Sequence, residues 1–510
     1  MHKKYILAHD TGTSGNKATI TDLSGKIIHS VYQEYGRSYP KHGWVEQDPD
    51  ELWKAVADST SQIFSETEIQ PREILGVGIS AQMFNLIPVD SNGKPIVKMI
   101  SWLDVRSINQ ADRVLRDNTK NLLYEQTGNV PTAKDIIPKI LWFKETHPEL
   151  WNRTYKLFDC KEYIIYKLTG EFATDWHGAS AFFLFDPNKK VWSKTACDCL
   201  GIPISMLPDP HPCTSIIGEV THDAAKQTGL LQGTPVVICA GDVAAAQVGS
   251  GASSQGKAHM SIGTAAWIGL SSDVFKNNPQ NPFWILNHID PDKWIIAGEM
   301  ETGGGSLMWF KETFCQLESE NAKIVGKSPY SLIGELASKI EPGANRLLFT
   351  PWLSGERAPV LDHYARGAWV GISLSHNKGH FARAVMEGVA FQLRWICEAL
   401  EQQNLIFDSV NSVGGGSTSP IWTQIISDVI NKDLHIVKNP LEAGAIGTAL
   451  TVAVGLGVYH DMDYVDQLIE IDHIVTPNTN NTKRYRDLYQ EYRQIYESLK
   501  PIYHRLHKLD

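Results

Sequence analysis

The sequence predicts an α/β fold built from two large domains. Strand-like and helix-like runs alternate along the whole chain, which is typical of α/β proteins. Several strand-like runs end in turns made of glycine and small hydroxyl residues. The chain has 510 residues, more than one hydrophobic core ordinarily supports. Its composition, 42% hydrophobic and 20% charged, is that of a globular protein.

The first region opens with three strand candidates, at 5–10, 17–22 and 26–35. A helix is expected next, because Asp48 suits an N-cap and Pro49 the first helical turn. The run 74–80 is apolar enough for a buried strand. Two further strands are expected around a turn at 91–93, which reads Ser-Asn-Gly.

A second region begins near residue 234, with an apolar strand that ends in Asp242 and leads into a helix of small residues. Two strands are then expected around Gly263 and Thr264, followed by a long helix at about 379–402. The strand "FDSVNSVGGGST", the helix "SPIWTQIISDVINKD" and the Ala/Gly-rich helix "EAGAIGTALTVAVGLGV" complete the pattern. The two halves echo one another weakly, since each has two strands joined by a Gly-Thr turn.

Charge and hydropathy exclude several classes of function. The formal net charge of −10 argues against a nucleic-acid-binding or anionic-membrane-binding surface. No apolar run is long enough to span a membrane, and the N-terminus lacks the features of a signal peptide. The seven cysteines, an odd number, favour buried thiols in a reducing cytoplasm over a disulfide framework. Cys197 and Cys199 lack metal-site spacing, so no metal is predicted there.

Glycine-rich turns are the strongest local signal. Neither a P-loop nor a G-x-G-x-x-G dinucleotide fingerprint occurs, which argues against a Rossmann dehydrogenase. Four other glycine turns follow strand-like runs, at 12–15, 263–264, 302–307 and 413–418. Their amides can approach an anion closely, and the hydroxyls add donors. Four such turns in one chain favour a phosphate-rich ligand.

Two carboxylates accompany these turns. Asp10 ends the first strand beside the first glycine turn and is suited to hold Mg²⁺, directly or through water. Asp242 precedes a helix and could act as a general base for a hydroxyl nucleophile. The alternative for either residue taken alone is a helix or turn cap.

Polar residues also follow the buried strand at 74–80. Gln82 and Asn85 come directly after it, and Trp102, Asp104 and Arg106 lie further along. A tryptophan with polar neighbours suits a sugar, which offers an apolar face and paired hydroxyls. The alternative is a core tryptophan beside a surface ion pair.

Taken together, these segments resemble the FGGY carbohydrate kinases, which have an actin-like, ribonuclease-H-like ATPase fold. The resemblance covers essentially the whole chain and follows the family's order. It rests on "DTGTSGNK", "HGWVEQDPDELW", "WLDVR", "PKILWFKE", "GDVAAAQVGSG", "SIGTAAW", "TGGGSLMWF", "PWLSGERAP" and "VGGGSTSPIWTQIISDVINKDL". It implies two actin-like domains around a central cleft, at 1–250 for the sugar and the first phosphate loop and at 251–510 for ATP.

The resemblance also implies roles for individual residues. Asp242 would be the catalytic base and Asp10 the carboxylate linked to Mg²⁺. Gln82, Met83, Trp102 and Asp104, together with Asp242, would line the sugar pocket. The expected ATP-binding residues are Gly12, Thr13, Ser14, Gly263, Thr264, Gly304, Gly305, Gly415 and Gly416. The expected cofactors are therefore ATP and Mg²⁺, and the expected partner is a small sugar or polyol. Family members are often dimers, but no segment here fixes an interface.

Within the family the chain is most similar to the xylulokinases, with one departure. Those enzymes usually carry Met-His-Gly where this chain has Met83, Phe84 and Asn85. Phe84 cannot hydrogen-bond a sugar, although Asn85 could. D-xylulose is therefore the first expectation, while ribulose, erythritol and glycerol stay open, glycerol as the weaker alternative. A non-catalytic ATP-binding relative also stays open, and Phe84 is the one feature that supports it.

Overall fold

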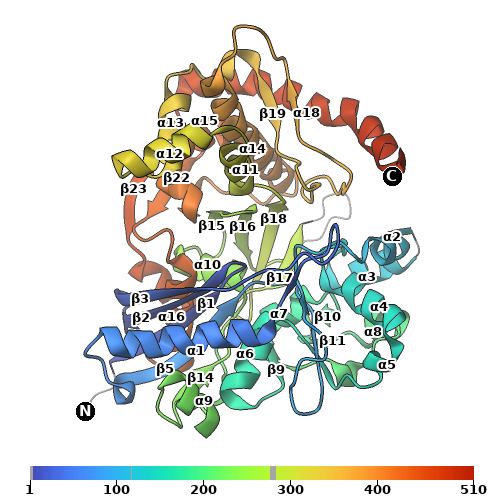
Figure 1. Ribbon diagram of the computed structural model, residues 1–510, viewed down its shortest axis with the longest axis vertical. Helices are drawn as coiled ribbons and strands as arrows, with labels where there is room; N and C mark the ends of the chain where they lie inside the picture. The colour runs from blue at the N-terminus through green and yellow to red at the C-terminus, as the bar shows by residue number, and fades with distance from the viewer. Residues whose placement is uncertain (1–3, 117, 276–282, 510) are drawn as a thin grey trace.

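The computed structural model describes residues 4–116, 118–275 and 283–509. Two domains lie one above the other, and each is built on a mixed sheet (Figure 1). In the first sheet the strands run in the order β13 (Ile216–Glu219), β14 (Pro235–Val237), β5 (Ile74–Ala81), β1 (Tyr5–Thr11), β2 (Gly15–Asp22) and β3 (Ile27–Glu34). In the second the order is β17 (Trp284–Asn287), β18 (Trp294–Met300), β16 (Ala266–Ser272), β15 (Ala258–Ile262), β21 (Ser409–Val413), β22 (Asp433–Val437) and β23 (Ile471–Val475).

The two sheets repeat one topology. In the first, β1 pairs antiparallel with β2 and parallel with β5, and β5 pairs parallel with β14. In the second, β15 pairs antiparallel with β16 and parallel with β21, and β21 pairs parallel with β22. An antiparallel strand, β13 or β23, closes the corresponding edge of each sheet. The weak sequence echo thus reflects a repeated unit, as the expected actin-like fold requires.

Helices cover both faces of the first sheet. On one face α1 (Pro49–Glu66) packs against β2 and β3, and on the other α16 (Ala443–Gly455) packs against β1 and β5. Asp48 caps α1 as expected, accepting a hydrogen bond from the Asp50 amide at 3.0 Å. Because β1 is covered on both faces, Ile6, Leu7 and Ala8 are all buried.

A close contact between α10 (Asp242–Gly249) and α16 joins the two domains. A Cβ at Gly447 would lie 1.9 Å from the Ala245 carbonyl oxygen, so the two helices could not approach this closely with any larger residue. The small residues of α16 therefore set the distance between the two halves of the molecule.

A helical lobe extends from the first domain (Figure 1). It contains α2 (Ile108–Arg116), α3 (Thr119–Thr127), α4 (Ile136–Thr146), α5 (Pro148–Trp151) and α8 (Lys194–Leu200). The helix α6 (Cys160–Thr169) packs against the first sheet, and α9 (His222–Thr228) packs against α1 and α6. The helix α7 (Trp176–Ala181) packs against β17 of the second sheet. The first domain also contains the short strands β4 (Glu46–Gln47), β6 (Ile87–Val89), β7 (Met99–Ile100), β8 (Lys156–Phe158), β9 (Ala173–Asp175), β10 (Phe185–Asp186), β11 (Val191–Trp192) and β12 (Asp209–His211). The second domain carries α11 (Gly304–Phe314), α12 (Gln316–Val325), α13 (Pro329–Ser338), α14 (Lys378–Glu401), α15 (Pro420–Ile430), α17 (Met462–Val465), α18 (Thr479–Leu506), β19 (Leu348–Thr350) and β20 (Ala368–Val370).

Most predicted elements form within one or two residues of their expected bounds, with two differences. The strand before Asp242 ends at Val237, and Asp242 is the first residue of α10. The strands around the 91–93 turn do not pair as a regular hairpin, because β6 pairs with β8 and β7 pairs with β4. The two sides are joined instead by isolated bridges, Leu86 with Ile100 and Val89 with Pro95, and by a few backbone hydrogen bonds.

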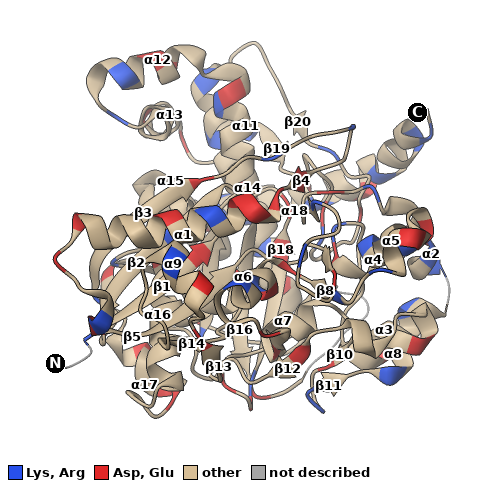
Figure 2. Cartoon of the chain, turned by 60° about the horizontal axis from the view of Figure 1, so that its bottom comes forward, with Lys and Arg blue, Asp and Glu red and all other residues tan. Residues whose placement is uncertain are grey.

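Both signs of charge are interspersed over the surface helices (Figure 2). No helix in the described part of the chain is long and apolar enough to cross a membrane. Six of the seven cysteines are buried, in line with the expected buried thiols, whereas Cys199 is exposed.

Candidate active site

The first glycine turn joins β1 to β2 beside Asp10. The Gly12 amide donates to the Gly15 carbonyl at 2.9 Å, which closes the turn, and the Tyr35 hydroxyl donates to the Gly12 carbonyl. The Gln47 side chain donates to the Thr13 carbonyl at 3.1 Å. Gln47 comes from the "HGWVEQDP" segment, so that segment supports the turn from the first domain.

Asp10 stands at the end of β1 and is partly exposed. Burial raises the pKa of its carboxyl, and nearby Lys17 opposes that rise. A Cβ at Gly444 would lie 2.7 Å from its Oδ2 atom, so the start of α16 packs directly against this carboxylate. A carboxylate desolvated in this way is stabilised by a divalent cation, so Asp10 fits the expected Mg²⁺.

Asp242 begins α10, where its Oδ1 atom accepts a hydrogen bond from the Val243 amide at 2.9 Å. Burial raises the pKa of its carboxyl to about 7, and the charge of Asp10 adds to the rise. The preceding Gly241 packs so closely that a Cβ there would lie 2.3 Å from the Met83 Sδ atom. The structure therefore brings Asp10, Asp242 and Met83 together from three separate segments.

The expected sugar-binding residues differ in burial: Trp102 is partly exposed, whereas Gln82 and Asp104 are buried. Trp102 is half-buried and donates its indole N–H to the Thr13 hydroxyl at 3.0 Å, which places it beside the first phosphate turn. Gln82 is buried and donates to the Gln47 side chain at 3.1 Å. Asp104 is fully buried and accepts hydrogen bonds from the Val45 amide and from Arg106. Its carboxylate thus holds the segment around Trp102.

Asn85 and Phe84 also point into the protein. The Asn85 amide donates to Asp159 at 2.8 Å and accepts from the Trp102 backbone N–H at 2.9 Å, so this side chain is occupied. The Phe84 ring packs against the rings of Trp284 and Phe183, at centroid distances of 4.8 and 5.8 Å. Neither side chain is placed to replace the histidine expected at this position from the resemblance to the xylulokinases. Asn85 was expected to be able to hydrogen-bond the sugar, but its side-chain amide is already hydrogen-bonded within the protein.

The other three glycine turns meet at one cavity of about 660 Å³ in the second domain. The Gly304 and Gly305 amides donate to the Gly263 and Thr264 carbonyls at 2.8 and 2.9 Å, which joins two of the turns. All six residues expected on the ATP side of the second domain line the cavity, namely Gly263, Thr264, Gly304, Gly305, Gly415 and Gly416. Both the size and the lining suit a nucleotide.

One wall of this cavity was not predicted. Tyr330, Ser331, Glu335 and Ser338 of α13 line it opposite the glycine turns. Their spacing repeats about every helical turn, as on any amphipathic helix, so the sequence alone does not mark them as ligand-binding.

Comparison with known proteins agrees with this geometry. The model for the N-terminal domain of the FGGY family of carbohydrate kinases matches residues 5–249, and the model for the C-terminal domain matches residues 258–456. The chain belongs to the FGGY family of carbohydrate kinases. It is therefore a sugar kinase, an enzyme that transfers a phosphoryl group to a sugar or polyol, and the non-catalytic alternative is set aside.

The similar proteins differ in substrate. A xylulose kinase of Staphylococcus epidermidis is 32% identical over 492 residues, covering 96% of each chain. A gluconokinase of Bacillus licheniformis is 30% identical over 486 residues, covering 95% of this chain and 94% of its own. Among solved structures, a xylulose kinase from Lactobacillus acidophilus has a TM-score of 0.89 and 25% identity, covering 99% of this chain and 100% of its own.

Proposed function

We propose that this FGGY kinase phosphorylates D-xylulose to D-xylulose 5-phosphate, with ATP as the phosphoryl donor. The observation that carries the proposal is the packing of Gly241 on Met83, which sets the Asp242 carboxylate beside the segments expected to hold the sugar. The xylulose kinases among the relatives support the choice of sugar.

Asp242 would act as the general base. Its pKa of about 7 leaves a large fraction of the carboxyl deprotonated at neutral pH, yet basic enough to accept the proton of a sugar hydroxyl. The hydroxyl oxygen would attack the terminal phosphorus of ATP in line. Positioning and charge neutralisation dominate such reactions, and the glycine turns at 12–15 and 263–264 would supply amide donors to the transferring group. Mg²⁺, held by Asp10, would neutralise phosphate charge.

Trp102 would offer its ring to the apolar face of the sugar, while Met83 fills the space between the sugar and Gly241. Asp104 would act indirectly, because its carboxylate is engaged by Arg106. Gln82 donates to Gln47, but its buried Oε1 atom accepts no hydrogen bond from the residues that the structure describes, so it would keep an acceptor for the sugar. Gly263, Thr264, Gly304, Gly305, Gly415 and Gly416 would hold the nucleotide. Thr13 and Ser14, with Gly12, would approach the transferring phosphate from the first domain.

Gluconate is the second candidate, because a gluconokinase is nearly as similar as the xylulose kinases. A gluconate carboxylate binds most strongly beside a cation that no protein carboxylate already neutralises. The Lys134 ammonium is already paired with the Glu301 carboxylate. Lys134 lies close to the sugar segment, since the Lys139 ammonium donates to both the Lys134 and the Phe84 carbonyls. Arg357 is likewise paired with Asp135 at 2.9 Å. Both of these cations are therefore already neutralised by protein carboxylates, which weighs against a gluconate carboxylate binding at either of them.

The test is ADP release with Mg-ATP across D-xylulose, L-xylulose, D-ribulose, L-ribulose, erythritol, glycerol, gluconate and no sugar. We expect D-xylulose to give the highest kcat/KM, with the product phosphorylated at O5. A higher kcat/KM for gluconate, or for any other compound of the series, would overturn the choice of sugar and leave the kinase assignment intact.

A further inference from the structure

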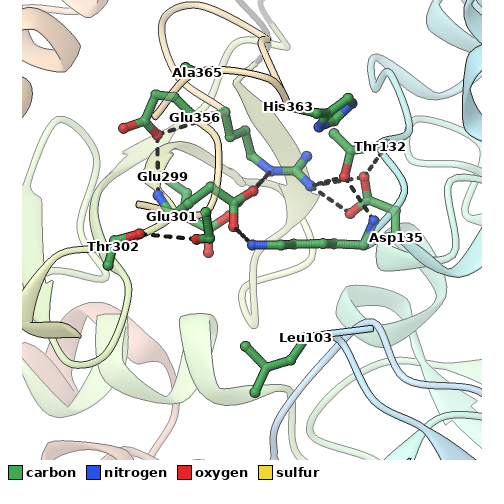
Figure 3. Close-up of polar contacts among 12 residues, drawn as sticks. Leu103, Thr132, Asp135, Glu299, Glu301, Thr302, Glu356, His363 and Ala365 are labelled. Carbon is green, nitrogen blue, oxygen red and sulfur yellow. Dashed lines mark hydrogen bonds and ion pairs between the residues drawn. The ribbon is translucent and has the colours of Figure 1, made fainter. Parts of the chain in front are cut away.

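A buried cluster of charged residues joins the two domains outside the nucleotide cavity (Figure 3). At its centre lies Arg357, which is 2% exposed. Its Nη2 atom donates to the Thr132 hydroxyl at 2.8 Å and to both Asp135 carboxylate oxygens at 2.9 Å. Thr132 and Asp135 belong to the N-terminal family domain, whereas Arg357 belongs to the C-terminal one. One guanidinium thus bridges the two halves of the kinase.

On the C-terminal side of this bridge, glutamates contact the Arg357 segment. The Arg357 Nε atom lies 3.2 Å from a Glu299 carboxylate oxygen. The Glu356 carboxylate accepts the backbone amides of both Glu301 and Arg357, at 3.1 and 2.8 Å. Glu301 in turn forms an ion pair with Lys134 of the N-terminal domain. Two cross-domain ion pairs, Arg357 with Asp135 and Lys134 with Glu301, therefore lie side by side.

An aromatic contact continues the bridge toward the sugar segment. The Arg357 guanidinium carbon lies 5.0 Å from the Trp284 ring centroid. Trp284, on β17 of the second domain, packs at 4.8 Å against Phe84 of the first. Phe84 has a φ of 65°, an uncommon conformation for an aromatic residue, which aims its ring across the domain boundary. The residue that departs from the xylulokinase pattern therefore serves the contact between domains.

The helix α4 connects this bridge to the backbone of the sugar segment. Asp135 is the residue immediately before α4, and Lys139 lies one turn further along it. The Lys139 ammonium is fully buried and donates to the Phe84 carbonyl at 2.7 Å and to the Lys134 carbonyl. A shift of Asp135 relative to Arg357 would thus move the carbonyl that follows Met83.

We propose that Arg357 is a positioning residue for phosphoryl transfer: it docks on Thr132 and Asp135 when the domains close, and through α4 and Lys139 it fixes the Met83–Phe84 turn against the sugar. Two-domain kinases close around their substrates, and contacts that exist only in the closed form favour closure. The Arg357 side chain is engaged by Thr132, Asp135 and Glu299, so its effect on the sugar segment passes through Asp135 and then Lys139. The proposal rests on the sugar site proposed above for this kinase.

The experiment compares Arg357→Gln with Arg383→Gln. Arg383 is a matched control, since it is 4% exposed and pairs with Glu387 at 2.7 Å wholly inside the C-terminal domain. Small-angle scattering with sugar and a non-hydrolysable ATP analogue reports closure, and steady-state kinetics reports kcat and both KM values. The sugar used is whichever compound gives the fastest ADP release with the unmodified enzyme, so an error in the choice of D-xylulose leaves this test intact.

We expect Arg357→Gln to lose ligand-induced compaction and about 10²-fold in kcat/KM for the sugar, with the KM for ATP within about twofold of the unmodified enzyme. Arg383→Gln should keep both compaction and kinetics even where its melting temperature falls. Asp135→Asn, which keeps the shape of the side chain, should reproduce the kinetic pattern of Arg357→Gln if that variant folds poorly. Normal compaction in either cross-domain variant, or equal kinetic losses in Arg383→Gln, would overturn the proposal.

Discussion

The indole N–H of Trp102 donates to the hydroxyl of Thr13 at 3.0 Å, across 89 residues of sequence. Trp102 belongs to the segment expected to hold the sugar, and Thr13 belongs to the turn expected to hold the transferring phosphate. One hydrogen bond therefore joins the segment expected to hold the sugar to the turn expected to hold the phosphate.

Trp102→Phe should separate these two roles. Phenylalanine keeps an apolar ring for the sugar but loses the hydrogen bond to Thr13, which is worth about 0.5–1.5 kcal/mol. We expect kcat/KM for the sugar to fall by about two- to tenfold. Trp192→Phe is the control, because that indole donates to the Pro208 carbonyl at 2.9 Å outside the site. Equal effects of the two substitutions would mean that the Thr13 contact has no special role.

The pH dependence of the reaction should report Asp242. A general base is active when deprotonated, and burial together with the charge of Asp10 raises the pKa of this carboxyl to about 7. Activity should therefore rise with pH through 7, and kcat/KM in the free enzyme should be about tenfold lower at pH 6 than at pH 8. A flat profile between pH 5 and 8 would exclude a base with this pKa.

Gly444→Ala tests the contact between α16 and Asp10. The added Cβ would lie 2.7 Å from the Asp10 Oδ2 atom, so the carboxylate must move. We expect a rise of at least about tenfold in the Mg²⁺ concentration needed for half-maximal activity, because the metal-linked carboxylate is displaced. Gly36→Ala is the control, since its Cβ would meet only Glu51 at 3.7 Å. An unchanged Mg²⁺ requirement would argue against the role of Asp10.

Gly304→Ala tests the meeting of two glycine turns at the nucleotide cavity. The added Cβ would lie 2.3 Å from the Gly263 carbonyl oxygen and would force the turns apart. The KM for ATP should rise by about tenfold or more, while the KM for the sugar stays within about twofold. A change confined to the sugar KM would place the nucleotide elsewhere.

Much of this arrangement could be predicted from sequence, since the strands, the capped helix α1 and the glycine turns all have local signals. Asp242 was expected at the end of a strand, but the strand stops at Val237 because the chain must turn before α10 begins. The use of Asn85 and Asp104 inside the protein could not be predicted, because their partners Asp159 and Val45 lie 74 and 59 residues away. The segment "PWLSGERAP" was part of the resemblance, yet only the fold shows that its arginine crosses the domain boundary.

The most direct test of the account is the turnover of Asp242→Asn measured beside its affinity for ATP. Asparagine keeps the size of the side chain but cannot accept the proton, and general-base catalysis contributes about 10²–10⁴-fold. We predict that sugar-dependent ADP release falls by about that factor, while the dissociation constant for ATP stays within about twofold of the unmodified enzyme. Full turnover in Asp242→Asn would contradict the assignment of Asp242 as the base and, with it, the proposed mechanism.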